Sequence, residues 1–278
     1  MTAEGSHRIT RLAGMPAVTL RVTEGSLACY RTHTHQEYSV GVVDAGEAVF
    51  DHPGGPHKVS AGAVVLIEPG VPHSCNPFSG SPWSYRMLFI EADWLHRLMA
   101  THFERAHPLV ALRFHTRRLT TPAATAQVDQ LCRAVDHTNA KDLAAERLAQ
   151  QLCHWLRTVT EPEAPADRPS LPAALAPAWD ALLGVEGRQV TVQSLAQRCS
   201  LHPTTFILRF KAAVGVTPGE FLRDRQINGA RQLIASGVNL ADAAYAMGFA
   251  DQAHMQRAFK ARHAMTPGRF ARRAAQGT

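Results

Sequence analysis

The most constraining feature of this sequence is an internal repeat in its last hundred residues. Sliding the chain along itself by 49 residues superimposes seven identical pairs: Phe210 on Phe259, Lys211 on Lys260, Ala212 on Ala261, Thr217 on Thr266, Pro218 on Pro267, Gly219 on Gly268 and Phe221 on Phe270. Seven identities within a twelve-residue window indicate one supersecondary unit used twice. The C-terminal part is therefore expected to consist of two equivalent halves.

Each half has the pattern of a helix, a short turn and a second helix. In the first unit, Thr191 can cap a helix over 192–199, and Pro203 opens the next helix, where its missing N–H is harmless. The second unit repeats the arrangement, with Asn239 before 240–247 and Asp251 before 252–264. Two helices joined by a turn of three or four residues are typical of helix-turn-helix domains.

The charge of the chain is divided between its two parts. Residues 1–177 hold 16 Lys and Arg against 17 Asp and Glu, a balance of −1, whereas residues 178–278 hold 13 against 6, a balance of +7. A nearly neutral part joined to a basic part is typical of a sensor attached to a module that binds a polyanion. We therefore predict double-stranded DNA as a partner.

The helical period divides the second helix of each unit into two faces. The buried faces are expected to hold Phe206, Phe210 and Val214 in unit one, and Met255, Phe259 and Arg262 in unit two. The opposite faces carry side chains suited to base edges, thymine methyls and phosphates. The predicted DNA-binding residues are Thr204, Thr205, Ile207, Leu208 and Lys211 in unit one, and Gln252, Ala253, Gln256, Arg257 and Lys260 in unit two.

From about Trp179 to Phe270 the sequence resembles the DNA-binding domain of the AraC/XylS family of bacterial transcription regulators. The resemblance rests on Leu240-Ala-Asp-Ala-Ala-Tyr-Ala-Met-Gly-Phe249 in unit two and on a connecting segment over 225–234. It implies a regulator that favours activation, contacts RNA polymerase and forms a homodimer. The sequence departs from the family at Leu208, where arginine is usual, but it retains the counterpart Arg257. We expect unit two to discriminate between base sequences more strongly than unit one, or the operator half that faces unit one to favour thymine methyls.

A proline-rich stretch over 160–177 separates this domain from the rest, and its five prolines are typical of a semi-rigid linker. Before it, short apolar runs between Gly, Pro and Asp turns predict strands over 17–23, 38–43, 47–51, 63–67 and 84–91.

Residues 122–159 show a helical period instead, which predicts either a helix pair covering the β-domain or a dimer contact. The chain is thus predicted to be multidomain: an all-β cupin-like barrel over 1–115, a helical segment over 116–159, the linker over 160–177, and an all-α double helix-turn-helix domain over 178–276 whose units are joined by a connecting helix.

The β-domain carries a cluster of histidines. His33, His35, Glu37 and Ser39 share one face of an extended segment, and His73 follows the strand over 63–67. This pattern resembles the two short motifs of cupin barrels, which AraC/XylS regulators often use to bind effectors, except that Ser39 stands where a metal-binding carboxylate is usual. Three uses remain open: a pocket for a small-molecule effector, a divalent metal site at the three histidines, or structural histidines at the barrel mouth. The candidate effector-binding residues are His33, His35, Glu37, Ser39, His73, Trp83 and Arg86.

Two classes of function follow from these patterns. The favoured one is a transcription regulator controlled by a small-molecule effector in the β-domain, and the alternative is a metal-dependent cupin enzyme that carries a DNA-binding module. The motifs G-x-S-x-G and H-E-x-x-H do not occur, which favours the regulator. Five widely spaced cysteines favour reduced thiols. Together with an N-terminus that has no apolar block, they favour a cytoplasmic protein. No apolar run approaches the roughly 20 residues that span a bilayer, so we expect no membrane partner. The candidate metal is the one cofactor that we consider.

Overall fold

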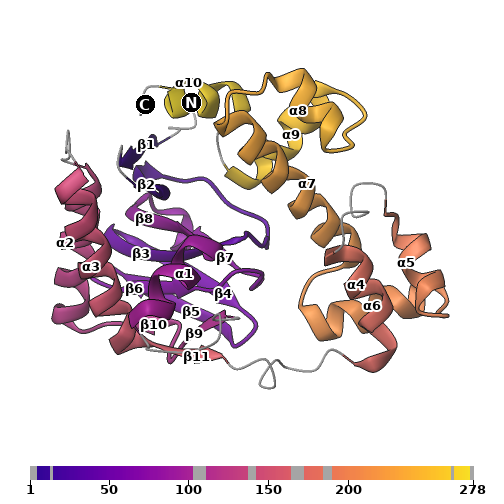
Figure 1. The fold of residues 1–278 in the computed structure, drawn as a ribbon, viewed down its shortest axis with the longest axis horizontal. Coiled ribbons are helices and arrows are strands. Elements are labelled where there is room, and N and C mark those ends of the chain that lie inside the picture. The colour runs from indigo at the N-terminus through magenta and orange to yellow at the C-terminus, as the bar shows by residue number, and fades with distance from the viewer. Residues whose placement is uncertain are drawn as a thin grey trace.

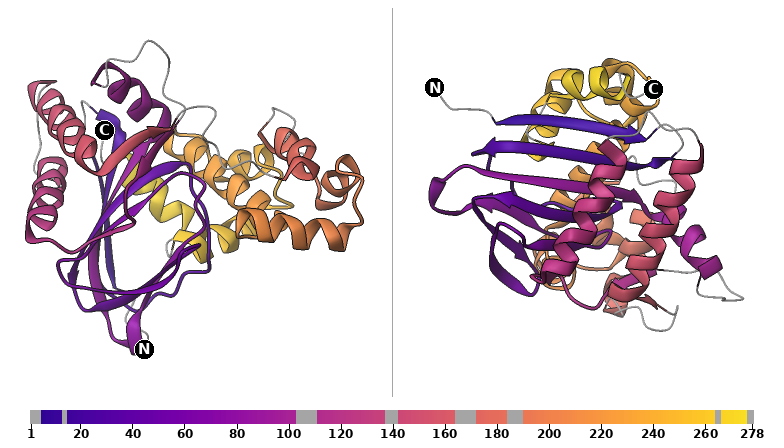
Figure 2. Two further views of the ribbon diagram at one scale, coloured as in Figure 1. Left: turned by 90° about the horizontal axis from the view of Figure 1, so that it is seen from below. Right: turned by 90° about the vertical axis from the view of Figure 1, so that its left-hand side faces the viewer.

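A computed structural model describes residues 5–12, 15–102, 111–136, 142–163, 172–183, 190–263 and 266–275. The N-terminal part forms a layered domain in which a helix pair covers a large sheet, with a smaller sheet on the other side (Figures 1 and 2). The C-terminal part is all-helical and lies against this β-domain along one side. The overall order of strands first and helix-turn-helix units second is as predicted.

Antiparallel strands build both sheets of the β-domain. The larger sheet has the order β1-β2-β8-β3-β6-β10, the smaller one has the order β5-β4-β7, and β9 pairs with β11 in a separate ribbon. The strands are β1 (Ser6–Leu12), β2 (Met15–Ser26), β3 (Glu37–Ala45), β4 (Glu47–His52), β5 (Gly55–Ser60), β6 (Val64–Ile67), β7 (Ser74–Pro77), β8 (Trp83–Glu91), β9 (Ala111–Phe114), β10 (Arg118–Leu119) and β11 (Thr160–Glu163). Among the described residues the two sheets do not close into a barrel, so the cupin-like domain is an open pair of sheets.

Both faces of the larger sheet are buried, and alternation along its strands decides which core each residue joins. In β3, Tyr38, Val40 and Val42 belong to a core shared with the covering helices. Val43, with Phe50 of β4, belongs to a second core between the two sheets. The face of the larger sheet that carries this second core also lines the cavity described below.

Helices α1 (Ala92–His102), α2 (Pro122–Asp136) and α3 (Asp142–Val159) cover the outer face of the larger sheet. The apolar stripes of α2 and α3, including Val128 and Leu152, are buried in the core of their own domain. The prediction of a helix pair covering the β-domain is therefore confirmed. A dimer contact through this segment stays a prediction.

Both ends of the predicted linker belong to regular secondary structure. Thr160–Glu163 forms β11, in which Pro162 lies opposite Leu112 of β9, and a 3-10 turn over Ala173–Leu175 leads into α4. The predicted linker over 160–177 is therefore too long at each end, because prolines are tolerated in an edge strand and in the first turn of a helix. Residues 164–171 lie outside the described part of the chain.

The C-terminal domain contains two small cores joined by one long helix. The first core lies among α4, α5, α6 and the start of α7, and the second lies among the rest of α7, α8, α9 and α10. The helices are α4 (Ala176–Leu183), α5 (Val192–Arg198), α6 (Pro203–Val214), α7 (Pro218–Ala235), α8 (Leu240–Ala246), α9 (Gln252–His263) and α10 (Pro267–Ala275). The connecting helix predicted between the units is α7. Of the helices described, none is both long and apolar enough to cross a membrane.

The predicted helix starts are present. In three of them the side-chain oxygen accepts a hydrogen bond from the backbone N–H three residues further on: Thr191 at 3.1 Å, Asn239 at 2.9 Å and Asp251 at 2.6 Å. Helices α5 and α8 each end one residue earlier than predicted. The predicted end of α9 at Ala264 lies outside the described residues.

Candidate effector and DNA-binding sites

The second helix of each unit, α6 and α9, has the two faces that its sequence predicts. Phe206 and Phe210 of α6, and Met255 and Phe259 of α9, are fully buried, whereas Val214 and Arg262, predicted for the same faces, are half-buried. On the opposite faces seven of the predicted DNA-binding residues are exposed and three are half-buried. The exposed ones are Thr204, Leu208, Lys211, Gln252, Ala253, Arg257 and Lys260, and the half-buried ones are Thr205, Ile207 and Gln256.

Leu208 is exceptional among these side chains. It is 65% exposed and is the one large apolar side chain among the seven exposed residues. Arg257, its counterpart in α9, is also exposed and keeps its guanidinium. The two units therefore present different chemistry at the same structural position: an apolar side chain in α6 and a cation in α9.

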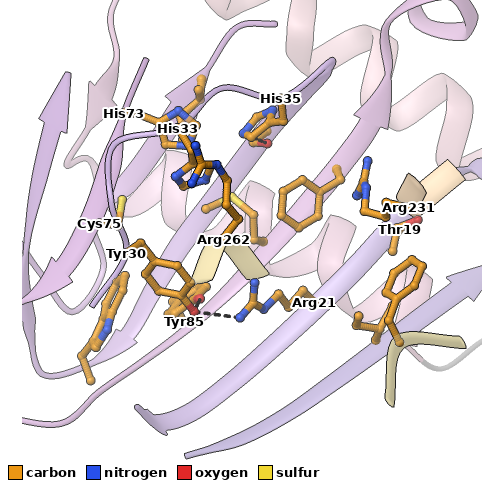
Figure 3. Close-up of a pocket in the computed structure, with 17 residues that line it drawn as sticks. Thr19, Arg21, Tyr30, His33, His35, His73, Cys75, Tyr85, Arg231 and Arg262 are labelled. Carbon is orange, nitrogen blue, oxygen red and sulfur yellow. Dashed lines mark hydrogen bonds between the residues drawn. The ribbon is translucent and has the colours of Figure 1, made fainter. Parts of the chain in front are cut away.

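A cavity lies where the β-domain meets the C-terminal domain (Figure 3). It holds about 900 Å³ of empty space, in which the open solvent at its mouth is included. The inner face of the larger sheet supplies most of its wall, through apolar side chains such as Ile67, Met87 and Phe89. Arg231 of α7, Arg262 of α9 and Phe270 of α10 complete the wall from the other domain.

Five of the seven predicted effector-binding residues line this cavity: His33, His35, Ser39, His73 and Trp83. Glu37 lies beside a smaller adjoining hollow and forms an ion pair with Arg231. Sequence reasoning did not identify Arg21 and Tyr30, or the arginines from the C-terminal domain, as cavity residues. No local signal marks them, because only the packing of distant strands and helices brings them together.

The three histidines lie together at one end of the cavity. The ring centroid of His73 is 4.6 Å from that of His33 and 4.8 Å from that of His35. Each Nδ1 is 2.9 Å from a backbone carbonyl oxygen, and Nε2 of His35 is 3.2 Å from the hydroxyl of Ser39. Burial lowers the pKa of His33 and of His73, which favours their neutral forms.

These rings do not fit a metal centre. Among the described residues no three His, Cys, Asp or Glu side chains are arranged to hold a metal ion. Ser39, which replaces the usual carboxylate, hydrogen-bonds to His35 instead of supplying a fourth ligand. The candidate metal site at His33, His35 and His73 is therefore not supported by their geometry.

The loops that carry the histidines also hold the two domains together. Between His33 and His35, the Thr34 backbone N–H and hydroxyl donate to Asp224 of α7 at 2.7 and 3.2 Å. The same carboxylate, which is 1% exposed, pairs with Arg262. Pro72, next to His73, packs closely against Gly215 at the end of α6. A Cβ atom at position 215 would lie only 3.1 Å from Cγ of Pro72.

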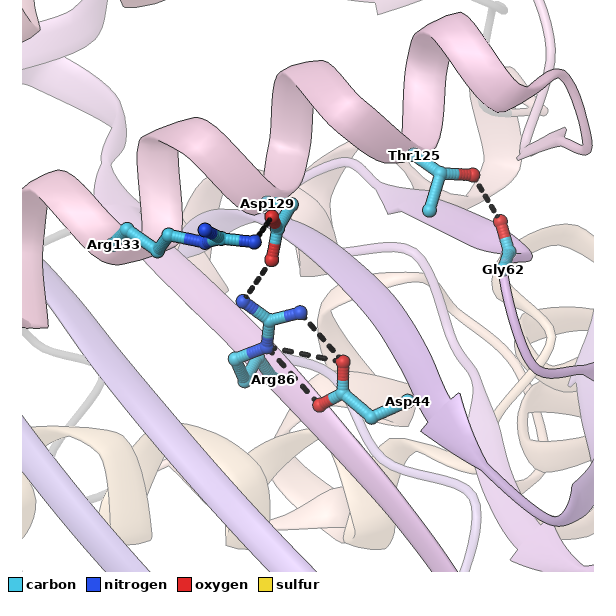
Figure 4. A network of polar contacts seen from close by, with 6 residues as sticks. All are labelled: Asp44, Gly62, Arg86, Thr125, Asp129 and Arg133. Atoms are coloured by element: carbon cyan, nitrogen blue, oxygen red, sulfur yellow. Dashed lines mark hydrogen bonds and ion pairs between the residues drawn. The ribbon is translucent and has the colours of Figure 1, made fainter.

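The assignment of Arg86 to the effector site is wrong. Arg86 faces the covering helices, where its guanidinium pairs with Asp44 at 2.6 Å and with Asp129 of α2 at 2.6 Å (Figure 4). The reason is strand alternation, since Trp83 and Tyr85 of β8 face the cavity side and Arg86 must then face the other way. Arg86 ties α2 to the sheet.

Comparisons with known proteins agree with both parts of the chain. Residues 22–153 match the family model of the AraC-like ligand binding domain, and residues 195–273 match that of a helix-turn-helix domain. An uncharacterized HTH-type transcriptional regulator, YbfI of Bacillus subtilis, is 21% identical over 84% of this chain and 83% of its own. A putative AraC-like transcription regulator of Streptomyces lividans is 30% identical over 46% of this chain and 39% of its own.

Solved structures share the two-domain fold. An apo ToxT variant from Vibrio cholerae superimposes with a TM-score of 0.60, at 12% identity, over 95% of this chain and 99% of its own. Unsaturated fatty acid-bound ToxT gives a TM-score of 0.57 at 13% identity over 98% and 97%. Fold, cavity and family matches together define a DNA-binding protein that carries its own ligand-binding domain. The chain belongs to the AraC family of transcription regulators, with an N-terminal effector-binding domain and a C-terminal helix-turn-helix domain.

Proposed function

We propose that a small-molecule effector binds in the cavity between the domains and thereby controls how α6 and α9 engage double-stranded DNA. The observation that carries this proposal is the composition of the cavity wall, which includes Arg231, Arg262 and Phe270 of the DNA-binding domain. A ligand in such a cavity contacts both domains at once. The fatty acid-bound ToxT structure, which shares this fold, supports a ligand-binding role for the architecture.

A single helix, α9, connects the cavity with the proposed DNA-binding surface. Arg262, on the side of α9 that faces the protein interior, lines the cavity, whereas Arg257 and Lys260 are exposed on the same helix. A ligand that changes the position of Arg262 therefore acts on the recognition helix directly. Such a ligand shifts the equilibrium between domain arrangements only to the extent that it binds one of them more tightly.

For DNA recognition we propose a division of labour between the units. In α9, Gln252, Gln256 and Arg257 have hydrogen-bonding groups for base edges, and Lys260 suits a phosphate. In α6, Ile207 and Leu208 suit thymine methyls, and Thr204, Thr205 and Lys211 supply polar contacts. Unit two then discriminates sequence by hydrogen bonds, and unit one does so mainly through apolar contacts.

The family also supports further roles for this chain. We propose that it acts in the cytoplasm as an activator that contacts RNA polymerase, and that it forms a homodimer. The outer face of α3, where Glu146, Arg147 and His154 are exposed, is available for a polar dimer contact. The proposed dimer predicts twice the chain mass of 30.3 kDa in sedimentation equilibrium.

The test is thermodynamic linkage between effector and operator. Ligands are found by thermal shift of the purified full chain, and operator affinity is then measured with and without each one. Because linkage is reciprocal, a ligand that changes operator affinity by some factor must have its own affinity changed by the same factor when operator is added. A ligand that occupies the cavity without changing operator affinity would contradict the proposed control.

A further inference from the structure

We infer that Arg21 is the binding site for an anionic group of the effector, and that the effector is an apolar carboxylic acid. This inference rests on the proposed function, since it names the class of ligand for the same cavity.

Arg21 projects from β2 into the cavity and is 8% exposed. One of its terminal nitrogens donates to the Tyr30 hydroxyl at 2.8 Å, and its Nε has no hydrogen-bond partner (Figure 3). Within the described residues no carboxylate lies within 4.0 Å of its guanidinium. Its Cζ lies over the rings of Tyr30 and Tyr85, 5.7 and 6.0 Å from their centroids, but neither ring supplies a full negative charge. A buried cation without a counter-ion is costly, and an anionic ligand would supply the counter-charge.

The other charged groups at the cavity are already matched. Arg231 pairs with Glu37, and Arg262 pairs with the buried Asp224. Tyr85 lies beside Arg21, but burial raises its pKa above the ordinary value, so it remains a neutral phenol. Among the described residues that line the cavity, Arg21 is thus the cation that an incoming anion can neutralise without breaking an existing ion pair.

The walls and the geometry of the cation favour a carboxylate on an apolar body. Near Arg21 the cavity is lined by Trp83 and Met87, and Phe270 faces it from α10. The Nε–H and a neighbouring terminal N–H form the edge of a guanidinium that binds a planar carboxylate through two parallel hydrogen bonds. A phosphate dianion would require a second cation, and the two other arginines at the cavity are already engaged.

The test uses matched probes that differ only in charge. Decanoate and 4-phenylbutanoate are compared with their primary amides by calorimetric titration of the full chain at neutral pH. We expect at least one acid to bind about 10- to 100-fold more tightly than its amide, because a charge-assisted hydrogen bond replaces a neutral one. In Arg21→Gln this preference should disappear, whereas Arg86→Gln, on the opposite face of the same sheet, should retain it.

A second variant keeps the inference testable if Arg21→Gln folds poorly. Arg21→Met removes the unpaired charge and keeps much of the volume, so without ligand its melting temperature should rise by about 2 °C or more. A lower melting temperature, or an unchanged acid preference in Arg21→Gln, would overturn the inference. Amides that bind as well as acids and change operator affinity would overturn the anion site but support the effector cavity. If no probe binds and the thermal-shift screen finds no ligand, both the anion site and the effector cavity are contradicted.

Discussion

Removal of the Asp224 carboxylate should weaken the docking of the β-domain onto α7. Asp224 accepts two hydrogen bonds from Thr34 across the domain boundary, at 2.7 and 3.2 Å, and pairs with Arg262 within its own domain. Hydrogen bonds to a charged acceptor contribute about 1.5–3 kcal/mol each. Loss of both in Asp224→Ala should therefore weaken docking by about 3 kcal/mol or more, a factor above about 100 in the docking equilibrium.

Hydrogen exchange measures this loss directly, because the Thr34 backbone N–H is one of the two donors. Exchange in the peptide that contains Thr34 should accelerate by about 100-fold or more in Asp224→Ala, while peptides from β8 keep their wild-type rates. Asp180→Ala, which removes an exposed carboxylate from α4 of the same domain, should leave the Thr34 amide protected. Equal protection of Thr34 in wild type and Asp224→Ala would refute the role of Asp224 at the boundary.

The other predictions concern DNA recognition, the sheet and pH. Arg257→Ala should cost about 1–3 kcal/mol of discrimination between the selected operator and a variant with one base pair changed, as measured by competition binding. Leu208→Arg should give unit one a hydrogen-bonding side chain, so the base preference of its operator half should change while that of the other half does not. Arg86→Gln should lower the free energy of unfolding by about 1.5–3 kcal/mol in chemical denaturation, with ligand affinity unchanged; a matching loss of affinity would place Arg86 back in the effector site. Because burial lowers the pKa of His33 and His73, the unfolded chain binds more protons below pH of about 6.5, and stability should fall on acidification by up to about 1.4 kcal/mol per pH unit for each histidine. The double variant His33→Gln and His73→Gln should show a shallower decline.

Features set by local sequence were predictable. Asn239 and Asp251 cap helices wherever the following residues are helical, and the 49-residue repeat fixes the equivalence of the two units. Alternation placed Ser39 and His35 on one side of their segment, and they are hydrogen-bonded there. The same rule, applied to β8, would have excluded Arg86 from a site that contains Trp83.

Features that depend on the docking of distant segments were not predictable in this way. Arg21, Arg231 and Arg262 come from a strand and two helices that no short-range pattern connects, so their meeting at one cavity required the tertiary structure. The prolines over 160–177 predicted a linker by composition, but the backbone pairing of Pro162 opposite Leu112 depends on the position of β9. The sequence alone did not show that Arg21 has no carboxylate partner among the residues that the structure describes.

Sequence-specific reading by both α6 and α9 is tested most directly by selection from a pool of random duplex DNA. The full chain is incubated with the pool at two salt concentrations, and the retained duplexes are sequenced. We predict enrichment of a bipartite site with halves about one helical turn, roughly 34 Å, apart, and an affinity that falls steeply with salt. Retention of DNA without enrichment of any sequence would contradict a two-unit reader and would indicate phosphate binding alone.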